Sequence, residues 1–199
     1  KPRFAVSEHE VVIVAARRTP IGAFQGVLSA ATAPQLGAAA LRGALESAGV
    51  AADQVQEVIM GCVLSGGLGQ APARQAALGA GVPKNVPTTT VNKMCGSAMK
   101  AIMLAADQIR AGDVETVLAG GLESMSNAPY LLPKARSGYR MGHGEILDHM
   151  VFDGLQSTCD GLHMVQQASN VSRELGITRE AQDAWAYRSH RRAAAAQAA

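Results

Sequence analysis

Short segments that favour strands alternate along this chain with longer segments that favour helices. The strand-like segments are residues 11–16, 57–64, 88–92 and 115–119. Their continuously apolar or β-branched character is typical of strands that are buried on both faces. Residues 34–48, residues 71–80 and the segment after Cys95 carry helix-forming patterns that end at glycine or proline. This alternation predicts an α/β fold, in which helices cover both faces of a layered sheet.

The composition excludes two classes of partner. Of the 199 residues, 48% are hydrophobic and 17% are charged, which suffices to build a buried core. A net charge of +2 and the lack of a Lys/Arg run argue against nucleic-acid binding. The longest apolar run is far shorter than the roughly 20 residues that a membrane helix needs. The sequence therefore predicts neither a nucleic-acid partner nor a membrane partner.

The chain divides into three regions of different character. Residues 1–10 have no apolar core of a secretory signal, which predicts a disordered lead-in. Residues 11–122 hold the alternating pattern and are expected to form one α/β domain. Residues 123–162 show no sustained period, which is long for a loop in a compact domain. We interpret residues 123–199 as part of an inserted loop domain, with helices expected at residues 164–175 and from residue 178 onward.

The cysteines are three in number and widely spaced, at Cys62, Cys95 and Cys159. They form no CxxC pair, so neither a disulfide framework nor a zinc site is predicted, and a reducing compartment is expected. Cys62 falls in a strand-like segment that should be buried, and Cys159 falls in the irregular region. Cys62 is therefore expected to be inert, and nothing near Cys159 in the sequence would activate its thiol.

Cys95 lies where a strand gives way to the first turn of a helix. The helix dipole and the unpaired backbone N–H groups at such a position favour the thiolate. Gly96 lets a substrate approach the backbone, and the same N–H groups can serve as an oxyanion hole. The helix that follows is apolar almost all round, which predicts its burial. The local sequence leaves two interpretations open, an activated nucleophile or a small buried hydrophobic residue.

Several stretches resemble the thiolase family, specifically its short-chain acetyl-CoA acetyltransferases. The most specific is VNKMCGSAMKAIM around Cys95, followed by VLAGGLESMSNAPYLL. Three others support it: VIVAARRTPIGAFQG, GQAPARQAALGAGVP and GITREAQDAWAYRSHRRA. The resemblance runs from Val11 over nearly the whole chain. It favours the nucleophile interpretation of Cys95 and implies the N-terminal half of a thiolase-like layered fold, with helices on both faces of a mixed sheet.

The resemblance implies acyl transfer between coenzyme A thioesters. Cys95 would carry the acyl group as an acyl-cysteine, so that two acetyl-CoA molecules give acetoacetyl-CoA and coenzyme A. It also assigns Leu155, His163 and Met164 to contacts with the pantetheine and acyl group, at matching separations of eight and nine residues. Coenzyme A enters as a substrate, and no metal or redox cofactor is implied.

The sequence departs from the family pattern in two ways. Val165 stands where the family has glycine, which adds bulk near the expected acyl pocket. The chain also lacks the Gly-His-Pro and Cys-x-Gly-Gly-Gly motifs that the family's second half supplies as base and second cysteine. We therefore expect an N-terminal half without its C-terminal thiolase domain. Because the α-proton needs a positioned base, this fragment should be inactive or nearly so by itself.

Two alternatives to a short-chain enzyme stay open. One is a degradative 3-ketoacyl-CoA thiolase that prefers longer chains, and the other is a non-catalytic subunit that binds acyl-CoA or acts as a scaffold. The family pattern implies a homodimer or homotetramer with a role in lipid metabolism, and a cytoplasmic location is expected, or the mitochondrial matrix if the chain is processed. The residues expected to be solvated, structural or in subunit contacts are Lys134, Arg136, Arg140, His143 and His149.

Overall fold

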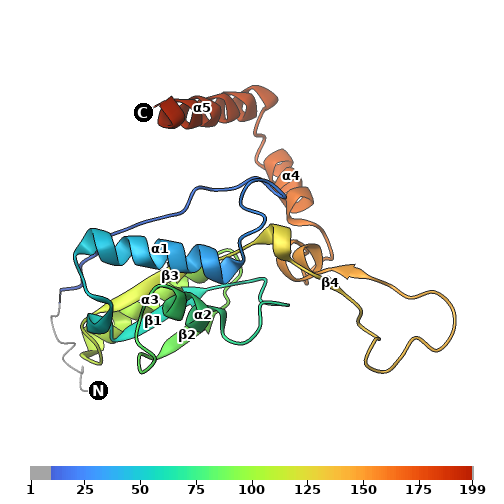
Figure 1. Ribbon diagram of the computed structural model, residues 1–199. Coiled ribbons are helices and arrows are strands. Elements are labelled where there is room, and N and C mark those ends of the chain that lie inside the picture. The colour runs from blue at the N-terminus through green and yellow to red at the C-terminus, as the bar shows by residue number, and fades with distance from the viewer. Residues whose placement is uncertain (1–9, 199) are drawn as a thin grey trace, which may run out of the picture. The chain divides into compact units, whose positions relative to one another are not determined.

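The computed structural model describes residues 10–198 of the chain (Figure 1). The predicted lead-in at residues 1–10 lies almost entirely outside this range. The chain divides into two compact units, one up to Gly154 and one from Leu155 onward. This division falls later than the predicted boundary, so the assignment of residues 123–199 to a loop domain stays a prediction.

Three parallel strands form the sheet of the first unit: β1 (Glu57–Gly61), β2 (Thr88–Val91) and β3 (Val117–Gly121). β1 lies in the middle, and Ile59 pairs with Thr89 on one side and with Ala119 on the other. Parallel neighbours need crossover connections, which contain α2 (Pro72–Gly79) and α3 (Ser97–Ala111). The predicted α/β fold is confirmed, and all three strands of this sheet run in the same direction.

Helices cover both faces of this sheet, as the alternation predicted (Figure 1). β1 is buried along its whole length, and its side chains alternate between the two faces. Val58 and Met60 pack against α1 (Ala33–Ala48) and α2, whereas Ile59 packs against α3. The helical side of the first cluster consists mainly of Leu41, Leu45, Ala73, Ala76 and Ala77. The predominance of alanine lets these helices approach the sheet closely.

The predicted helix at residues 34–48 is confirmed as α1, and its ends show why it forms there. Thr32 accepts a hydrogen bond from the backbone N–H of Gln35 (3.3 Å), and the Gln35 side chain accepts one from the backbone N–H of Thr32 (2.8 Å). This capping box satisfies two N–H groups that have no partner within the helix. Gly49 ends the helix with a φ of 65°, a conformation that glycine adopts without strain.

The predicted strand at residues 11–16 is wrong. The structure gives these residues no strand partner, and the side chains of Val12 and Ile13 are 64% and 77% exposed. They line one side of a cavity of about 390 Å³, whose other walls come from α1, α3 and β3. The predicted burial of this run on both faces is therefore wrong as well. The apolar run could not supply a neighbouring strand, and a strand without ladder hydrogen bonds does not form.

The predicted burial of α3 on all sides is also wrong. Ala101 and Ala105 are buried against the sheet, but Met99, Ile102 and Met103 are 69%, 46% and 51% exposed. The sheet covers only one face of this helix. The main packing partners of α3 are the three strands of the sheet, and the apolar side chains that point away from the sheet are largely exposed.

The remainder of the first unit is mostly irregular, as its sequence predicted. It contains the short 3-10 helices η1 (Ala52–Gln54) and η2 (Met125–Asn127) and a two-stranded antiparallel ladder. That ladder pairs β4 (Tyr130–Leu131) with β5 (Leu147–Asp148), and the π-helical turn η3 (Met150–Leu155) follows.

The second unit consists of a turn followed by α4 (Met164–Glu174) and α5 (Arg179–Ala198). Both of the helices predicted in this part of the chain are confirmed. Among the helices in residues 10–198, none combines the length and apolar character needed to cross a membrane.

Candidate active site

Cys95 lies in the turn that joins β2 to α3, as its sequence context predicted. β2 ends at Val91 and α3 begins at Ser97, so the turn follows the carboxyl end of a parallel strand. In open α/β sheets this edge is the usual place for a ligand. Cys95 is exposed, which excludes the alternative that it is a buried hydrophobic residue.

The residue before Cys95 has an unusual backbone conformation. Met94 has a φ of 48°, in the left-handed region that few residues other than glycine adopt. The side-chain oxygen of Asn92 accepts a hydrogen bond from the Met94 N–H at 2.9 Å. Such an Asx turn lets a short polar side chain stabilise a tight reversal of the backbone.

Ser97 makes two further hydrogen bonds across the same turn. Its Oγ accepts from the backbone N–H of Lys93 at 2.8 Å and donates to the carbonyl oxygen of Met94 at 2.6 Å. The Ser97 N–H donates to the same carbonyl at 3.0 Å. Because Ser97 is only 4% exposed, water competes poorly for these bonds.

The first turn of α3 lies directly on the sheet because β1 ends in a glycine. A Cβ atom at Gly61 would lie 2.5 Å from the carbonyl carbon of Ser97 and 2.6 Å from the backbone nitrogen of Ala98. Gly121 at the end of β3 has a similar role, since a Cβ there would lie 2.8 Å from the Cβ of Ala98. The two glycines therefore allow the helix end that carries the turn to approach the strand ends.

Glu123 joins the ends of β1 and β3. Its carboxylate accepts hydrogen bonds from the backbone N–H groups of Val63 and Leu64, both at 2.9 Å. The Cys62 thiol lies 3.6 Å from the same carboxylate. Burial, then the charge of Glu123, then this hydrogen bond raise the pKa of Cys62 to about 12. Cys62, one residue beyond the end of β1 rather than inside the strand, is thus held as the neutral thiol.

The cysteines, histidines and carboxylates of the described residues were the next candidates for a functional cluster. Within residues 10–198, no group of three or more His, Cys, Asp or Glu side chains could hold a metal ion. Cys159 is exposed in a turn, where its backbone N–H donates to Ser157 Oγ at 3.2 Å.

The two histidines that the sequence assigned to structural or solvated positions differ in their surroundings. His149 is buried, its Nδ1 lies 2.5 Å from an Asp153 oxygen, and its Nε2 accepts from the backbone N–H of Gly66 at 3.2 Å. Since Nε2 accepts, Nδ1 carries the proton and donates to Asp153. His149 thus links the loop after β1 to η3, whereas His143 and the basic side chains at Lys134, Arg136 and Arg140 are exposed.

The second unit brings together the residues predicted to contact pantetheine, namely Leu155, His163 and Met164. Gln156 and His163 form an antiparallel bridge, so Leu155 and Met164 each lie one residue from the bridged pair. His163 also begins α4, where its Nδ1 accepts from the backbone N–H of Val165 at 3.2 Å. His163 is half-buried, and Met164 is 44% exposed. Cys95 belongs to the first unit.

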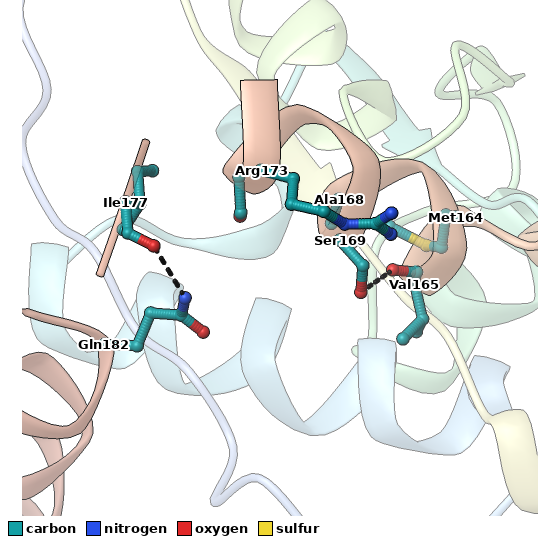
Figure 2. Close-up of a pocket in the computed structure, with 8 residues that line it drawn as sticks. Met164, Val165, Ala168, Ser169, Arg173, Ile177 and Gln182 are labelled. Atoms are coloured by element: carbon teal, nitrogen blue, oxygen red, sulfur yellow. Dashed lines mark hydrogen bonds between the residues drawn. The ribbon is translucent and has the colours of Figure 1, made fainter. Parts of the chain in front are cut away.

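Met164 also lines a pocket of about 500 Å³ within the second unit (Figure 2). The wall is formed by α4, the residues that follow it and the start of α5: Met164, Val165, Ala168, Ser169, Ser172, Arg173, Ile177 and Gln182. Hydrogen bonds fix two wall side chains, from Ser169 Oγ to the Val165 carbonyl (3.0 Å) and from Gln182 to the Ile177 carbonyl (3.2 Å). Val165, the residue that replaces the family's glycine, is thus a wall residue and 65% exposed.

Sequence reasoning missed the residues that shape the turn around Cys95, which are Asn92, Ser97 and Gly61. Signals for them were present. Asparagine and serine within a few residues of a turn form local hydrogen bonds to the backbone, and an isolated glycine in a strand often marks a close backbone approach. Their joint role became visible only once the strand and the helix were placed together.

Comparison with known proteins identifies the family of this chain. The model of the thiolase N-terminal domain family matches residues 11–199. An acetyl-CoA acetyltransferase of Cupriavidus necator is 55% identical over 190 residues, which cover 96% of this chain and 48% of that protein. One of Pseudomonas aeruginosa is 53% identical, with 94% and 48% covered, and the mitochondrial one of Bos taurus is 48% identical, with 94% and 44% covered.

The extent of these matches defines what the chain corresponds to. The chain spans about half the length of the curated relatives that it matches, and the matched half is the one that the family model describes as N-terminal. The chain belongs to the thiolase family and contains its N-terminal domain.

Proposed function

We propose that the polypeptide containing this domain transfers acetyl groups between coenzyme A thioesters, with Cys95 as the nucleophile. The observation that supports this most strongly is an exposed cysteine in a turn that is held by side-chain hydrogen bonds and lies between a parallel strand and a helix. The other two cysteines fit the role less well. Cys62 is buried with a raised pKa, and Cys159 lies in a solvated turn.

The proposed first step exchanges one thioester for another. The Cys95 thiolate attacks the carbonyl carbon of an acyl-CoA, a C–S bond to Cys95 forms, and the C–S bond to coenzyme A breaks as its thiolate leaves. The acyl group then passes to a second molecule, either coenzyme A or the α-carbon of acetyl-CoA after loss of a proton. In the family pattern, the Gly-His-Pro and Cys-x-Gly-Gly-Gly motifs supply the proton transfers, and this sequence does not contain them. We therefore assign the proton transfers to the rest of the polypeptide.

Leu155, His163 and Met164 are the proposed contacts for coenzyme A. Their clustering at the Gln156–His163 bridge supports a common role, because two apolar side chains there flank a polar one. The apolar pair suits a pantetheine chain, and the imidazole offers a hydrogen bond. Coenzyme A is then a substrate, and the proposed chemistry requires no metal or redox cofactor.

The names of the relatives favour acetyl transfer over the thiolysis of longer chains. We further propose that the polypeptide assembles as a homodimer or homotetramer, which is supported by the exposed apolar side chains on α3. A cytoplasmic location is proposed. Since one relative is named mitochondrial, the mitochondrial matrix is the alternative.

The test is mass spectrometry of the complete polypeptide after brief exposure to acetoacetyl-CoA. We expect an acetyl adduct on the peptide that contains Cys95, and neither adduct nor turnover in Cys95→Ser. Cys159→Ser is the matched control, because that cysteine is also exposed but lies in a solvated turn. An adduct on a different residue, or turnover that survives in Cys95→Ser, would refute the proposal.

A further inference from the structure

The turn at Cys95 contains a conformation that its own sequence does not favour. Met94 has a φ of 48°, yet it is neither glycine nor a residue whose side chain stabilises the left-handed region. Such conformations persist only where the surrounding structure enforces them, and they cluster at functional sites. The groups that enforce this one can be identified.

Two side chains hold Met94 through opposite ends of its backbone. Asn92 accepts a hydrogen bond from the Met94 N–H at 2.9 Å, while the Ser97 hydroxyl donates to the Met94 carbonyl at 2.6 Å. The same hydroxyl accepts from the Lys93 N–H at 2.8 Å. Both polar groups of the Met94 backbone are therefore fixed by side chains on either side of Cys95 in the sequence.

Ser97 is itself fixed by its surroundings. It is 4% exposed, and its backbone lies against Gly61 so closely that no Cβ would fit between them. Asn92, in contrast, is exposed and can be changed without disturbing the core. The hydrogen bonds that hold Met94 thus come from one buried, rigid side chain, Ser97, and one side chain at the surface, Asn92. We call this pair of side chains the brace.

We propose that Asn92 and Ser97 are positioning residues, which hold Met94 in its left-handed conformation and thereby direct the thiol and backbone N–H of Cys95 towards the substrate. The inference rests on the proposed function of Cys95 as the nucleophile. Because Met94 directly precedes Cys95, any relaxation of Met94 to a negative φ rotates the peptide group between them. The thiol and the N–H would then point away from their present directions.

The brace is tested by substitutions in the complete polypeptide. We expect Ser97→Ala and Asn92→Ala to lower kcat about 10- to 100-fold, with KM changed by less than about threefold, because misplacement of a reacting group acts mainly on the chemical step. The rate at which iodoacetamide alkylates Cys95 should fall as well. Alkylation reports on the position and accessibility of the Cys95 thiol and does not depend on catalytic turnover.

Two conservative variants separate positioning from a merely structural role. Asn92→Asp keeps an oxygen acceptor for the Met94 N–H and should retain most of the activity. Met94→Gly adopts the left-handed region without a side-chain penalty, so the double variant Asn92→Ala/Met94→Gly should recover most of what Asn92→Ala loses. Ser137→Ala, which removes an exposed hydroxyl far from the turn in sequence, is the matched control and should have no effect.

The proposal is overturned if Ser97→Ala and Asn92→Ala alkylate at the rate of the unmodified protein, or if Met94→Gly brings no recovery. Should Ser97→Ala fail to fold, the exposed Asn92 still decides the outcome, through Asn92→Ala and the double variant Asn92→Ala/Met94→Gly. Failure of the proposed function is a separate result. It would appear as turnover in Cys95→Ser, whereas failure of the brace would appear in the alkylation rates of Cys95.

Discussion

At the scale of single residues, burial decides which cysteine is able to react. Cys62 and Cys95 lie at the ends of neighbouring strands, yet one is buried beside a carboxylate and the other is exposed. Desolvation and the nearby charge of Glu123 both disfavour the Cys62 thiolate. Since the thiolate is the nucleophile, the two residues should differ in reactivity by more than their accessibility alone implies.

We predict that iodoacetamide labels Cys95 and Cys159 between pH 7 and pH 9 and leaves Cys62 unlabelled. With a pKa of about 12, Cys62 has a thiolate fraction of about 10⁻⁴ at pH 8. Quantitative peptide mass spectrometry of the native protein measures this directly. Because the pKa of Cys62 is raised, its labelling should increase only as the pH approaches 12 or as the protein unfolds.

Glu123→Gln is the matched variant for this prediction. It removes the charge but leaves burial, the largest cause of the raised pKa, in place. Labelling of Cys62 should therefore increase only modestly. Rapid labelling of Cys62 in the native protein at pH 8 would show that this site is open to solvent and that the prediction is wrong.

At the scale of secondary-structure elements, the sequence predicted what depends on local chemistry. The helix α1 followed from its proline, its periodic leucines and Gly49, and β1 and β2 followed from their apolar or β-branched character. The segment at residues 11–16 looked the same but is paired with no strand. Whether an apolar segment becomes a strand depends on a partner distant in sequence, which local patterns do not encode.

The candidate site shows the same division between local and distant information. The position of Cys95 between a strand and a helix was predictable because both elements have strong local signals. The close contact between Gly61 and Ser97 was not, since it joins residues from different elements. The clustering of Leu155 with His163 and Met164 depends on a short turn, but their role in binding stays a prediction.

The close contact between β1 and α3 predicts that a side chain at Gly61 destabilises the protein. In Gly61→Ala, the new Cβ would lie 2.5 Å from backbone atoms that cannot move without shifting the helix. We expect the free energy of unfolding to fall by about 1–3 kcal/mol or more, as in other overpacked cores. The alkylation rate of Cys95 should fall with it, because the turn is attached to the displaced end of α3.

Gly43→Ala is the control for this prediction. Gly43 lies within α1, and a Cβ there would meet only the Arg17 side chain at 3.8 Å, an ordinary contact distance. Alanine in a helix interior should stabilise the protein by about 0.5–1 kcal/mol. Chemical denaturation of both variants provides the measurement. If the two substitutions had equal effects, the close contact at Gly61 would not be decisive.

At the scale of the whole molecule, the first unit leaves apolar surface uncovered. Met99, Ile102 and Met103 are exposed on α3, and Val12 and Ile13 are exposed beside the cavity that they line. The chain spans about half the length of its curated relatives. Exposed apolar side chains on neighbouring elements usually mark surfaces that contact other protein segments.

We predict that the 199-residue chain associates with itself in a concentration-dependent manner. Burial of apolar area favours association by roughly 25 cal/mol per Å² before the entropic cost of binding is subtracted. Sedimentation velocity over a hundredfold range of concentration should show the sedimentation coefficient rising with concentration. Ile102→Gln/Met103→Gln should shift association to higher concentration while lowering the free energy of unfolding only slightly, because about half of each residue is already exposed in the monomer, at 46% and 51%.

The control for self-association is a substitution of an exposed aromatic residue on α5. Trp185 is 67% exposed and lies under the Arg188 guanidinium, with 3.9 Å between the guanidinium carbon and the ring centroid. This cation–π contact already covers one face of the ring, so Trp185→Gln should change association less than the α3 variant does. If Trp185→Gln had the larger effect, the second unit rather than the outer face of α3 would carry the contact. The exposed methionines of α3 would then be ordinary surface residues, and their exposure would give no support to an assembly through that helix.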